Sequence, residues 1–305
     1  MTAASGLVVV DKPAAWTSHD VVARIRRLAG TRRVGHAGTL DPMATGVLVV
    51  GVEKATRLLG HLMLAQKQYA GTVRLGQSTD TDDADGQIVA AAPVHGVGAA
   101  DVRAAARRLT GQIQQVPPGV SAIKVSGRRA YELARAGEAP QLAARTVTVE
   151  SLDILAIRPA GDVLDVDIDV ACSSGTYIRA IARDLGAALG TGGHLTALRR
   201  TRAGAYTAGA ASTLDQLAAD WQLIPLAQAA ADAFPRLDLA EDQARLVAHG
   251  GRLPAPSGGV AVSGPPGPGP VAAFGPDGTL IALLTGQPAG PGQPAGLRPL
   301  AVFVP

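Results

Sequence analysis

Cysteine is nearly absent from this sequence, whose 305 residues include only Cys172. A single cysteine excludes an intrachain disulfide and any metal site built from several cysteines. We expect Cys172 to be a small buried hydrophobic residue. The acidic run at 79–86 fails the ligand spacing of a calcium-binding EF-hand loop, so we interpret it as a turn and expect no metal site.

Long hydrophobic runs are also missing, although 47% of the residues are hydrophobic. No apolar run is long enough to cross a membrane, and the N-terminus lacks the basic-then-apolar layout of a signal peptide. We therefore expect a cytoplasmic protein that does not contact membranes. A chain of this length allows one large domain and a small one.

Lysine is scarce too, since only four of the 28 basic residues are lysines. Arginine suits phosphate because its planar guanidinium can donate two parallel hydrogen bonds. The arginines gather at 24–33 and at 179–202, and such a patchy basic surface fits a nucleic-acid-binding protein despite a net charge of only +3. Biased codon usage is the alternative explanation of an arginine-rich, lysine-poor composition.

One glycine-rich stretch, residues 32–46, has the composition of an active-site loop. Its glycines allow tight turns and a close approach to a ligand, and Pro42 keeps Asp41 out of a helix interior. The apolar run at 47–52 that follows is typical of a buried strand. A lone carboxylate in this position is a candidate nucleophile or general base, whereas the more common alternative is a turn aspartate with local hydrogen bonds.

Hydrophobic periodicity predicts a mixture of strands and helices. Apolar or alternating runs predict strands at 6–10, 47–52, 67–76 and 163–170. Helical spacing predicts helices at 21–28, 54–64, 99–109 and 241–249. Thr17 and Asp20 have the spacing of a capping box at the start of the first helix. The strand at 163–170 alternates between an apolar and an acidic face, which is typical of a half-buried antiparallel strand.

Two stretches are specific enough to carry a family resemblance. Residues 35–48, with the sequence GHAGTLDPMATGVL, resemble the catalytic motif of the TruB family of tRNA pseudouridine-55 synthases. Residues 175–179, with the sequence GTYIR, resemble a second motif of that family, in which the tyrosine lines the uracil pocket and the arginine pairs with the catalytic aspartate. The resemblance covers residues 6–204 well and the remainder weakly.

The resemblance implies an α+β fold, with a mixed, largely antiparallel sheet flanked by helices. It implies an enzyme that isomerises uridine 55 in the T-loop of tRNA to pseudouridine. In this reaction a C–N glycosidic bond breaks, the base rotates and a C–C bond forms, so no atom is gained or lost and we expect no cofactor. A T-loop uridine is buried in folded tRNA, so the enzyme must flip it out. We expect a monomer whose partner is tRNA, contacted at the T-loop and T-stem.

The resemblance also assigns roles to residues of the predicted pocket. Asp41 is the essential catalytic residue, which attacks the base or the sugar or promotes loss of uracil. Arg179 keeps Asp41 ionised and oriented, because an opposite charge favours the carboxylate. Tyr69 stacks on the flipped uracil and acts in proton transfer. Tyr177 and Leu198 form walls of the pocket that exclude water.

His36 lies on the same loop as Asp41, and three interpretations of it stay open. It could act in acid–base catalysis, it could be a loop histidine with a local hydrogen bond, or it could be an aromatic plug. We favour the plug, in line with the resemblance, because a flat imidazole can stack in the space that flipped nucleotides leave.

Further basic residues match the family at expected RNA contacts. One of them belongs to an N-terminal lysine-proline motif, and the others lie in a segment at 113–145 that resembles an RNA-binding region of the family. We expect substrate binding from Lys12, Lys124, Arg128 and Arg129. The alternative is an ordinary loop residue for the first lysine and a solvated helix face for the arginines.

Beyond about residue 232 the composition changes. A Gly/Pro tract at 257–270 is too flexible for a core, and short strands are predicted at 271–274, 280–284 and 300–303. Because the family often ends in a PUA or PUA-like RNA-binding domain, we predict a catalytic domain at 1–232 and a small β-rich PUA-like domain at 233–305.

Two other classes of protein compete with this interpretation. The chain could be a non-catalytic RNA-binding or tRNA-folding protein on the same scaffold, or an α+β protein of another function whose arginines are solvated. Binding alone does not need Asp41, Tyr69 and Arg179 together, so their joint presence favours an enzyme.

Overall fold

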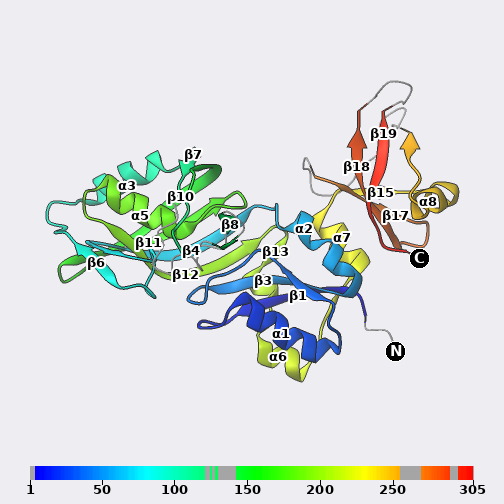
Figure 1. Cartoon of the computed structure of the whole chain (residues 1–305), viewed down its shortest axis with the longest axis horizontal. Coiled ribbons are helices and arrows are strands. Elements are labelled where there is room, and N and C mark those ends of the chain that lie inside the picture. Colours follow the sequence, from blue (N-terminus) through cyan, green and yellow to red (C-terminus); the bar gives the residue numbers. More distant parts are fainter. Residues whose placement is uncertain are drawn as a thin grey trace.

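The computed structural model describes residues 4–120, 124–125, 128–129, 142–254, 269–288 and 295–304. The molecule is elongated, with a large sheet along most of its length and a smaller sheet at the C-terminal end (Figure 1). No helix in these ranges is long and apolar enough to cross a membrane.

The large sheet is built from strands of the first three quarters of the chain. Its strands are β1 (Gly6–Lys12), β2 (Val34–Ala37), β3 (Thr45–Val52), β4 (Lys67–Leu75), β7 (Gly111–Gln115), β10 (Arg145–Ala160), β11 (Val163–Cys172), β12 (Gly193–Ala203), β13 (Tyr206–Thr207) and β14 (Ile224–Pro225). Two hairpins stand outside it, β5 (Gln77–Thr79) with β6 (Ile88–Ala91), and β8 (Lys124–Val125) with β9 (Arg128–Arg129).

Helices flank this sheet, and a second sheet follows. The α-helices are α1 (Ser18–Ala29), α2 (Leu59–Leu62), α3 (Ala99–Arg108), α5 (Ile178–Ala188), α6 (Leu214–Ala219), α7 (Leu226–Ala233) and α8 (Glu241–Ala248), with 3-10 turns at Glu53–Arg57 and Ala208–Ala210. The second sheet contains β15 (Arg236–Asp238), β16 (Leu253–Pro254), β17 (Val271–Phe274), β18 (Leu280–Gln287) and β19 (Gly296–Val302).

The order of strands in the large sheet is β14-β1-β3-β12-β4-β11-β10-β7, with β2 and β13 paired to its side. Every pairing is antiparallel except that of β3 with β12, which is parallel and joins only two residue pairs. The predicted mixed, largely antiparallel sheet flanked by helices is therefore confirmed. Strand β12 comes late in the chain but lies between β3 and β4, and the two halves of the sheet meet there.

Gly46 allows this junction to form. Its φ is +96°, in the left-handed region that glycine adopts readily. A Cβ at this position would collide with the backbone carbonyl of Arg200, so a larger residue would push β12 away from β3. The junction lies five residues after Asp41, and it therefore brings the predicted catalytic loop next to β12.

Several local predictions are confirmed. Thr17 and Asp20 form the predicted capping box at the start of α1, and the helix ends at Gly30 in the left-handed conformation. The acidic face of β11 is satisfied by its neighbour β4, since Asp165 accepts two hydrogen bonds from Arg74. The lone cysteine is fully buried, as expected.

The predicted continuous helix at 54–64 is wrong. The chain forms a 3-10 turn at Glu53–Arg57 and then the short helix α2. Neither start has a side-chain cap, and Gly60 lies inside the second piece, so the segment lacks the features that favour one long helix.

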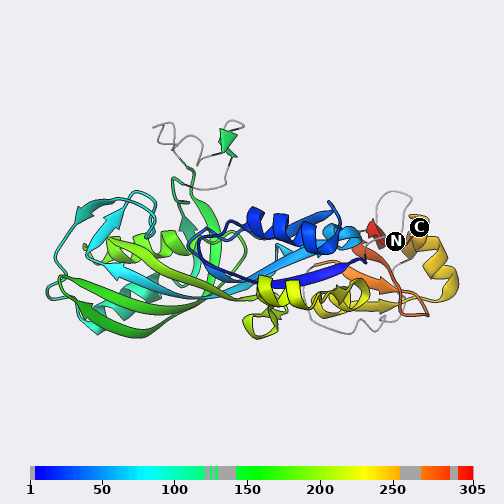
Figure 2. The ribbon, with the colours of Figure 1, turned by 90° about the horizontal axis from the view of Figure 1, so that it is seen from below.

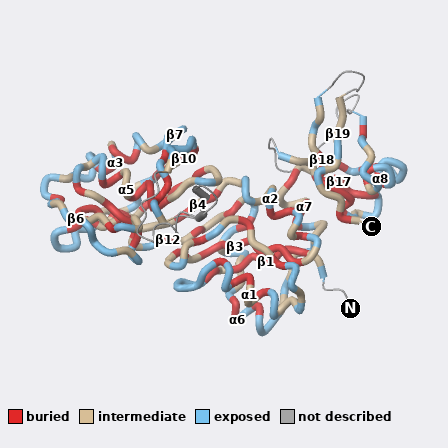
Figure 3. The backbone as a smooth tube through the Cα atoms, in the orientation of Figure 1, coloured by how far each residue is buried: buried red, intermediate tan, exposed pale blue. Residues whose placement is uncertain are grey.

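The C-terminal sheet packs directly against the large one. The three short strands predicted there are present as β17, β18 and β19, although most of the Gly/Pro tract at 257–270 lies outside the described residues. Phe234 and Phe274 share one buried cluster with Leu7 and Val47 of the large sheet. Figure 3 shows buried segments in both sheets and exposed outer loops and turns. The two sheets therefore have a common hydrophobic core at their junction.

Candidate active site

A cavity of about 430 Å³ opens beside the junction of β3 and β12. Its lining comes from the loop after β2, from β4, from the start of α5 and from β12. The five predicted pocket residues all line it, namely Asp41, Tyr69, Tyr177, Arg179 and Leu198. Segments that are far apart in the sequence are thus brought to one place by the strand order.

Asp41 and Arg179 form an ion pair at this cavity. The Asp41 Oδ2 lies 2.9 Å from the Arg179 Nε, and the aspartate side chain is 36% exposed whereas the arginine side chain is 5% exposed. The N–H of that nitrogen does not point at the oxygen, so the contact is electrostatic without a directed hydrogen bond. A carboxylate open to a ligand is therefore backed by a buried cation.

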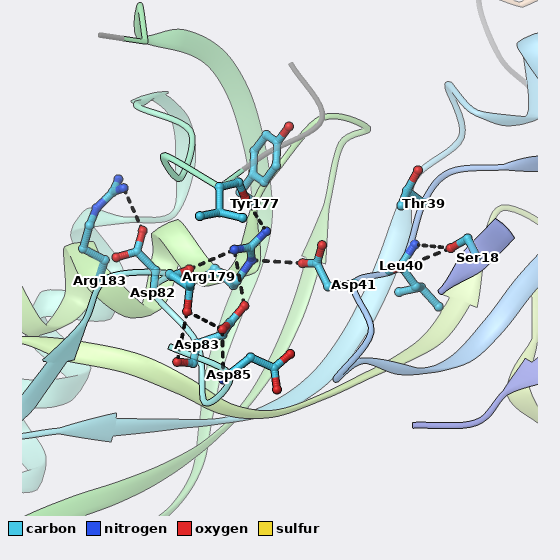
Figure 4. A network of polar contacts seen from close by, with 12 residues as sticks. Ser18, Thr39, Leu40, Asp41, Asp82, Asp83, Asp85, Tyr177, Arg179 and Arg183 are labelled. Atoms are coloured by element: carbon cyan, nitrogen blue, oxygen red, sulfur yellow. Dashed lines mark hydrogen bonds and ion pairs between the residues drawn. The ribbon is translucent and has the colours of Figure 1, made fainter. Parts of the chain in front are cut away.

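Arg179 is also held by groups that the sequence analysis missed (Figure 4). Its Nη1 lies 3.3 Å from the Asp83 Oδ2 and donates to the Thr81 carbonyl at 2.8 Å, and its Nη2 donates to the Val120 carbonyl at 3.0 Å. The Asp83 side chain is almost fully buried. These contacts fix both terminal nitrogens of the guanidinium, so that Nε remains the nitrogen closest to Asp41.

The acidic run at 79–86 is a turn, as predicted, but it also anchors this ion pair. The Asp82 carbonyl accepts a hydrogen bond from the Leu195 amide of β12, and the Asp82 carboxylate pairs with Arg183 of α5 at 3.1 Å. The turn is thereby bound to two elements of the site. In the sequence, the run of acidic residues was the only indication of this anchor, and it does not show which of the carboxylates becomes buried.

Tyr69 forms part of the cavity wall from strand β4. The side chain is 7% exposed, and burial raises the pKa of its phenol, so the hydroxyl stays protonated. A neutral phenol can stack on a base and can donate or pass a proton. Arg200 is directly opposite Tyr69 in the pairing of β4 with β12.

Arg200 is a second residue that the sequence analysis missed, because it lay in a general cluster of arginines. It is 1% exposed and lines the cavity. Its Nε donates to the Val47 carbonyl at 2.6 Å and its Nη2 to the Gly38 carbonyl at 3.0 Å. Arg200 therefore ties β12 to the loop that carries Asp41.

Lys12 supports the same loop. It is completely buried, and its Nζ donates to the carbonyls of Pro13, Trp16 and Pro42 at 2.8, 2.5 and 3.2 Å. Burial lowers the pKa of this ammonium to about 8. Its described contacts position the residue after Asp41, and a direct contact of Lys12 with RNA stays a prediction.

Tyr177 is the N-cap residue of α5. The buried Gln115 side chain accepts a hydrogen bond from its amide at 2.8 Å and donates to its carbonyl at 3.1 Å. Leu198 and Arg200 point to the cavity, whereas Arg199 between them pairs with Asp11, as the alternation of a strand requires. These wall residues of the cavity are therefore positioned by α5 and β12.

The remaining predicted residues lie away from the cavity lining. His36 is on β2 and makes an edge-to-face contact with His19, with ring centroids 5.7 Å apart. Burial lowers the pKa of His36, and its Nδ1 has no hydrogen-bond partner among the described residues. The backbone of Lys124, Arg128 and Arg129 forms the β8–β9 hairpin, which stands apart from the large sheet (Figure 2). Their side chains lie outside what the structure describes.

Comparison with known families places the chain in one of them. Residues 26–178 match the model of the TruB family pseudouridylate synthase N-terminal domain. Residues 179–229 match a tRNA pseudouridylate synthase B C-terminal domain, and residues 234–304 match the C-terminal domain of tRNA pseudouridine synthase II. The mixed sheet is that of the pseudouridine synthase fold. The chain belongs to the TruB family and is a tRNA pseudouridine synthase, an isomerase that acts on tRNA.

Curated relatives are similar over almost their whole length. A tRNA pseudouridine synthase B from Thermobifida fusca (strain YX) is 59% identical, with 95% of this chain and 97% of the relative covered. One from Arthrobacter sp. (strain FB24) is 56% identical, with 99% and 97% covered.

Solved structures extend the similarity to the C-terminal sheet. A chain of a Cbf5-Nop10-Gar1 complex has a TM-score of 0.74 and 27% identity, with 98% of this chain and 85% of that chain covered. A chain of an H/ACA RNP bound to a substrate RNA containing 2'-deoxyuridine has a TM-score of 0.72 and 26% identity, with 98% and 85% covered. The C-terminal sheet accordingly belongs to a PUA-like domain.

Proposed function

We propose that this enzyme isomerises uridine 55 in the T-loop of tRNA, with Asp41 as the essential catalytic carboxylate. The observation that carries the proposal is the partly exposed Asp41 carboxylate, paired with the buried Arg179 in a cavity that Tyr69 helps to line. The ion pair with Arg179 holds the Asp41 carboxylate at the cavity. A carboxylate in this cavity can act on a glycosidic bond.

The reaction follows from this arrangement. The target uridine leaves its stack and enters the cavity, where Tyr69 stacks on the uracil and Tyr177 and Leu198 exclude water. Asp41 attacks the base or the sugar, or promotes the departure of uracil, and each route requires a negative charge next to the glycosidic bond. The base then rotates and C5 bonds to the ribose C1′, while the proton on C5 moves to N1.

Other parts of the chain provide the RNA-binding surface in this proposal. Lys124, Arg128 and Arg129 contact the RNA backbone from the segment at 113–145, because arginine and lysine bind phosphate without reading sequence. The catalytic domain spans 1–232 and the PUA-like domain 233–305. The enzyme acts as a monomer in the cytoplasm.

The test is an assay with a T-loop stem-loop RNA that contains the target uridine. We expect pseudouridine at that position alone, detected by nuclease digestion and chromatography of the nucleosides. The matched control is a stem-loop in which cytidine replaces the target and the other uridines are kept. Tight binding of the first RNA with no pseudouridine formed would instead support a non-catalytic RNA-binding protein.

A second prediction concerns His36, which we propose to stack in the space that the flipped nucleotides leave. Stacking needs a ring rather than a titratable proton, and it contributes on the order of 1–3 kcal/mol. His36→Phe should therefore retain about 5- to 150-fold more activity than His36→Ala. The half-buried imidazole is compatible with this role, because its Nδ1 makes no hydrogen bond with the described residues.

The measurement is the single-turnover rate on the stem-loop RNA over a range of pH. The wild-type profile should show no essential pKa that disappears in His36→Phe. Equal inactivity of His36→Phe and His36→Ala, with normal RNA binding by both, would overturn the plug and favour acid–base catalysis by His36.

A further inference from the structure

Two consecutive apolar side chains stand exposed at the mouth of the Asp41 cavity. Met63 is 45% exposed and Leu64 is 71% exposed, and both line the cavity. Single exposed hydrophobic residues are common on protein surfaces, but apolar side chains grouped at a substrate opening mark a place of contact. They follow the short helix α2 and do not belong to the core.

The turn that carries these side chains is firmly held. Lys67 is 7% exposed, and its Nζ donates to the carbonyls of Met63 and Ala65, both at 2.7 Å. The next residue, Gln66, accepts a hydrogen bond from the Gly204 amide at 2.9 Å. Burial lowers the pKa of Lys67 to about 8, because the amine that holds this turn is removed from water. The backbone that carries the two apolar side chains is therefore held in place by these hydrogen bonds.

The surroundings of the turn suit RNA. The Gln66 side chain accepts a hydrogen bond at 3.0 Å from Arg202, which brings a positive charge to the turn. Leu64 also lines a second cavity of about 300 Å³, together with Tyr206 and Phe234. Leu64 thus separates the catalytic cavity from an apolar hollow that is large enough to accommodate a base edge.

When a nucleotide leaves a stacked RNA loop, its neighbours lose a stacking surface. Proteins that unstack nucleic acids often insert apolar side chains such as leucine or methionine at the opened step. An apolar surface directly at the cavity mouth is in a position to meet the nucleotides that flank the flipped uridine. The chemistry of the turn therefore selects one partner, an unpaired nucleobase next to the target.

We propose that Met63 and Leu64 form an apolar lip that packs against the nucleobase adjacent to the target uridine and keeps it out of its stack. The proposal rests on the proposed function, because it requires the uridine to enter the cavity. Lys67 is a positioning residue for the lip, since it acts only through the backbone of the turn.

The test uses the full chain with Leu64→Ser, and Leu64→Gln as a second variant. Leu64 is 71% exposed, so thermal unfolding should be unchanged in both variants. The matched control is Leu155→Ser, since Leu155 is a similarly exposed leucine on β10 that does not line the cavity. We expect about a tenfold weaker Kd and lower kcat/KM for the stem-loop RNA in both Leu64 variants, with the control unchanged.

A second readout separates base packing from general weakening. With 2-aminopurine directly 3′ or 5′ of the target, wild-type binding should raise the fluorescence at one of the two positions, because the base leaves its stack. Leu64→Ser at saturating concentration should lose most of this rise. Unchanged Kd and kcat/KM would overturn the lip, and so would weaker binding with the full fluorescence rise. A dimer of the wild type that Leu64→Ser dissociates would assign the lip to a second copy of the chain.

Failure of the lip is distinguishable from failure of the proposed function. If the wild type forms pseudouridine in the stem-loop and the Leu64 variants are equally active, only the lip is wrong. If the wild type binds the RNA and forms no pseudouridine, the proposed function is wrong and the lip falls with it.

Discussion

Asp41→Asn is expected to lower kcat by on the order of 10⁴-fold or more, while RNA affinity stays within a few-fold. The amide has nearly the same size and keeps the loop in place, but it has no negative charge for the reaction. The fold should tolerate the change, because Arg179 keeps Asp83 and two backbone carbonyls as partners.

Single-turnover pseudouridine formation and equilibrium RNA binding measure the two parts of this prediction. Wild-type enzyme purified in parallel is the control for activity, and the unfolding temperature is the control for structure. Multiple turnover by a pure Asp41→Asn preparation would remove Asp41 from the role of catalytic carboxylate.

Arg179→Lys is expected to lower the single-turnover rate by on the order of 10²-fold, although the positive charge is kept. The guanidinium contacts Asp41, Asp83 and two carbonyls at fixed angles, and an ammonium on a flexible chain cannot reach all four. Asp41 would keep a nearby cation but would lose its orientation. The effect should therefore fall on kcat more than on KM.

The matched control is Arg183→Lys, one turn further along α5. Arg183 pairs with Asp82 of the same acidic turn at 3.1 Å, but it does not contact Asp41. We expect at most a few-fold loss in this variant. A rate near that of the wild type in Arg179→Lys would show that position 179 needs only a charge, which would contradict an orienting role.

The sequence predicts the residues of the cavity wall better than it predicts what holds them. Asp41, Tyr69 and Arg179 lie in stretches whose resemblance to a family is local and specific, and the structure brings them to one cavity. Asp83 and Arg200 were missed because their burial depends on strand pairing over long distances in the chain. From the sequence alone, an acidic run and an arginine cluster are both typical of exposed residues. Their burial becomes apparent only when β12 is known to lie between β3 and β4.

The limits of local patterns also explain the error at 54–64. Apolar spacing indicated a helix, but the segment has to turn closely past β3, where a Cβ on Gly51 would contact the Ala55 carbonyl. Tertiary packing overrides helical propensity in such a segment. In the C-terminal region, by contrast, alternating strands and Gly/Pro turns were sufficient to predict β17, β18 and β19.

The position of β12 has a consequence for how the enzyme is made. Strands β3 and β4 follow one another in the chain, but they are joined only through β12, which is synthesised more than a hundred residues later. A nascent or truncated chain that ends before Gly193 therefore leaves an open edge on each half of the sheet, and such edges invite pairing with other chains. The same chain lacks Leu198 and Arg200, and with them a wall of the cavity and the support of the Asp41 loop. Protection from aggregation and catalytic competence are thus acquired together, at the same step of synthesis.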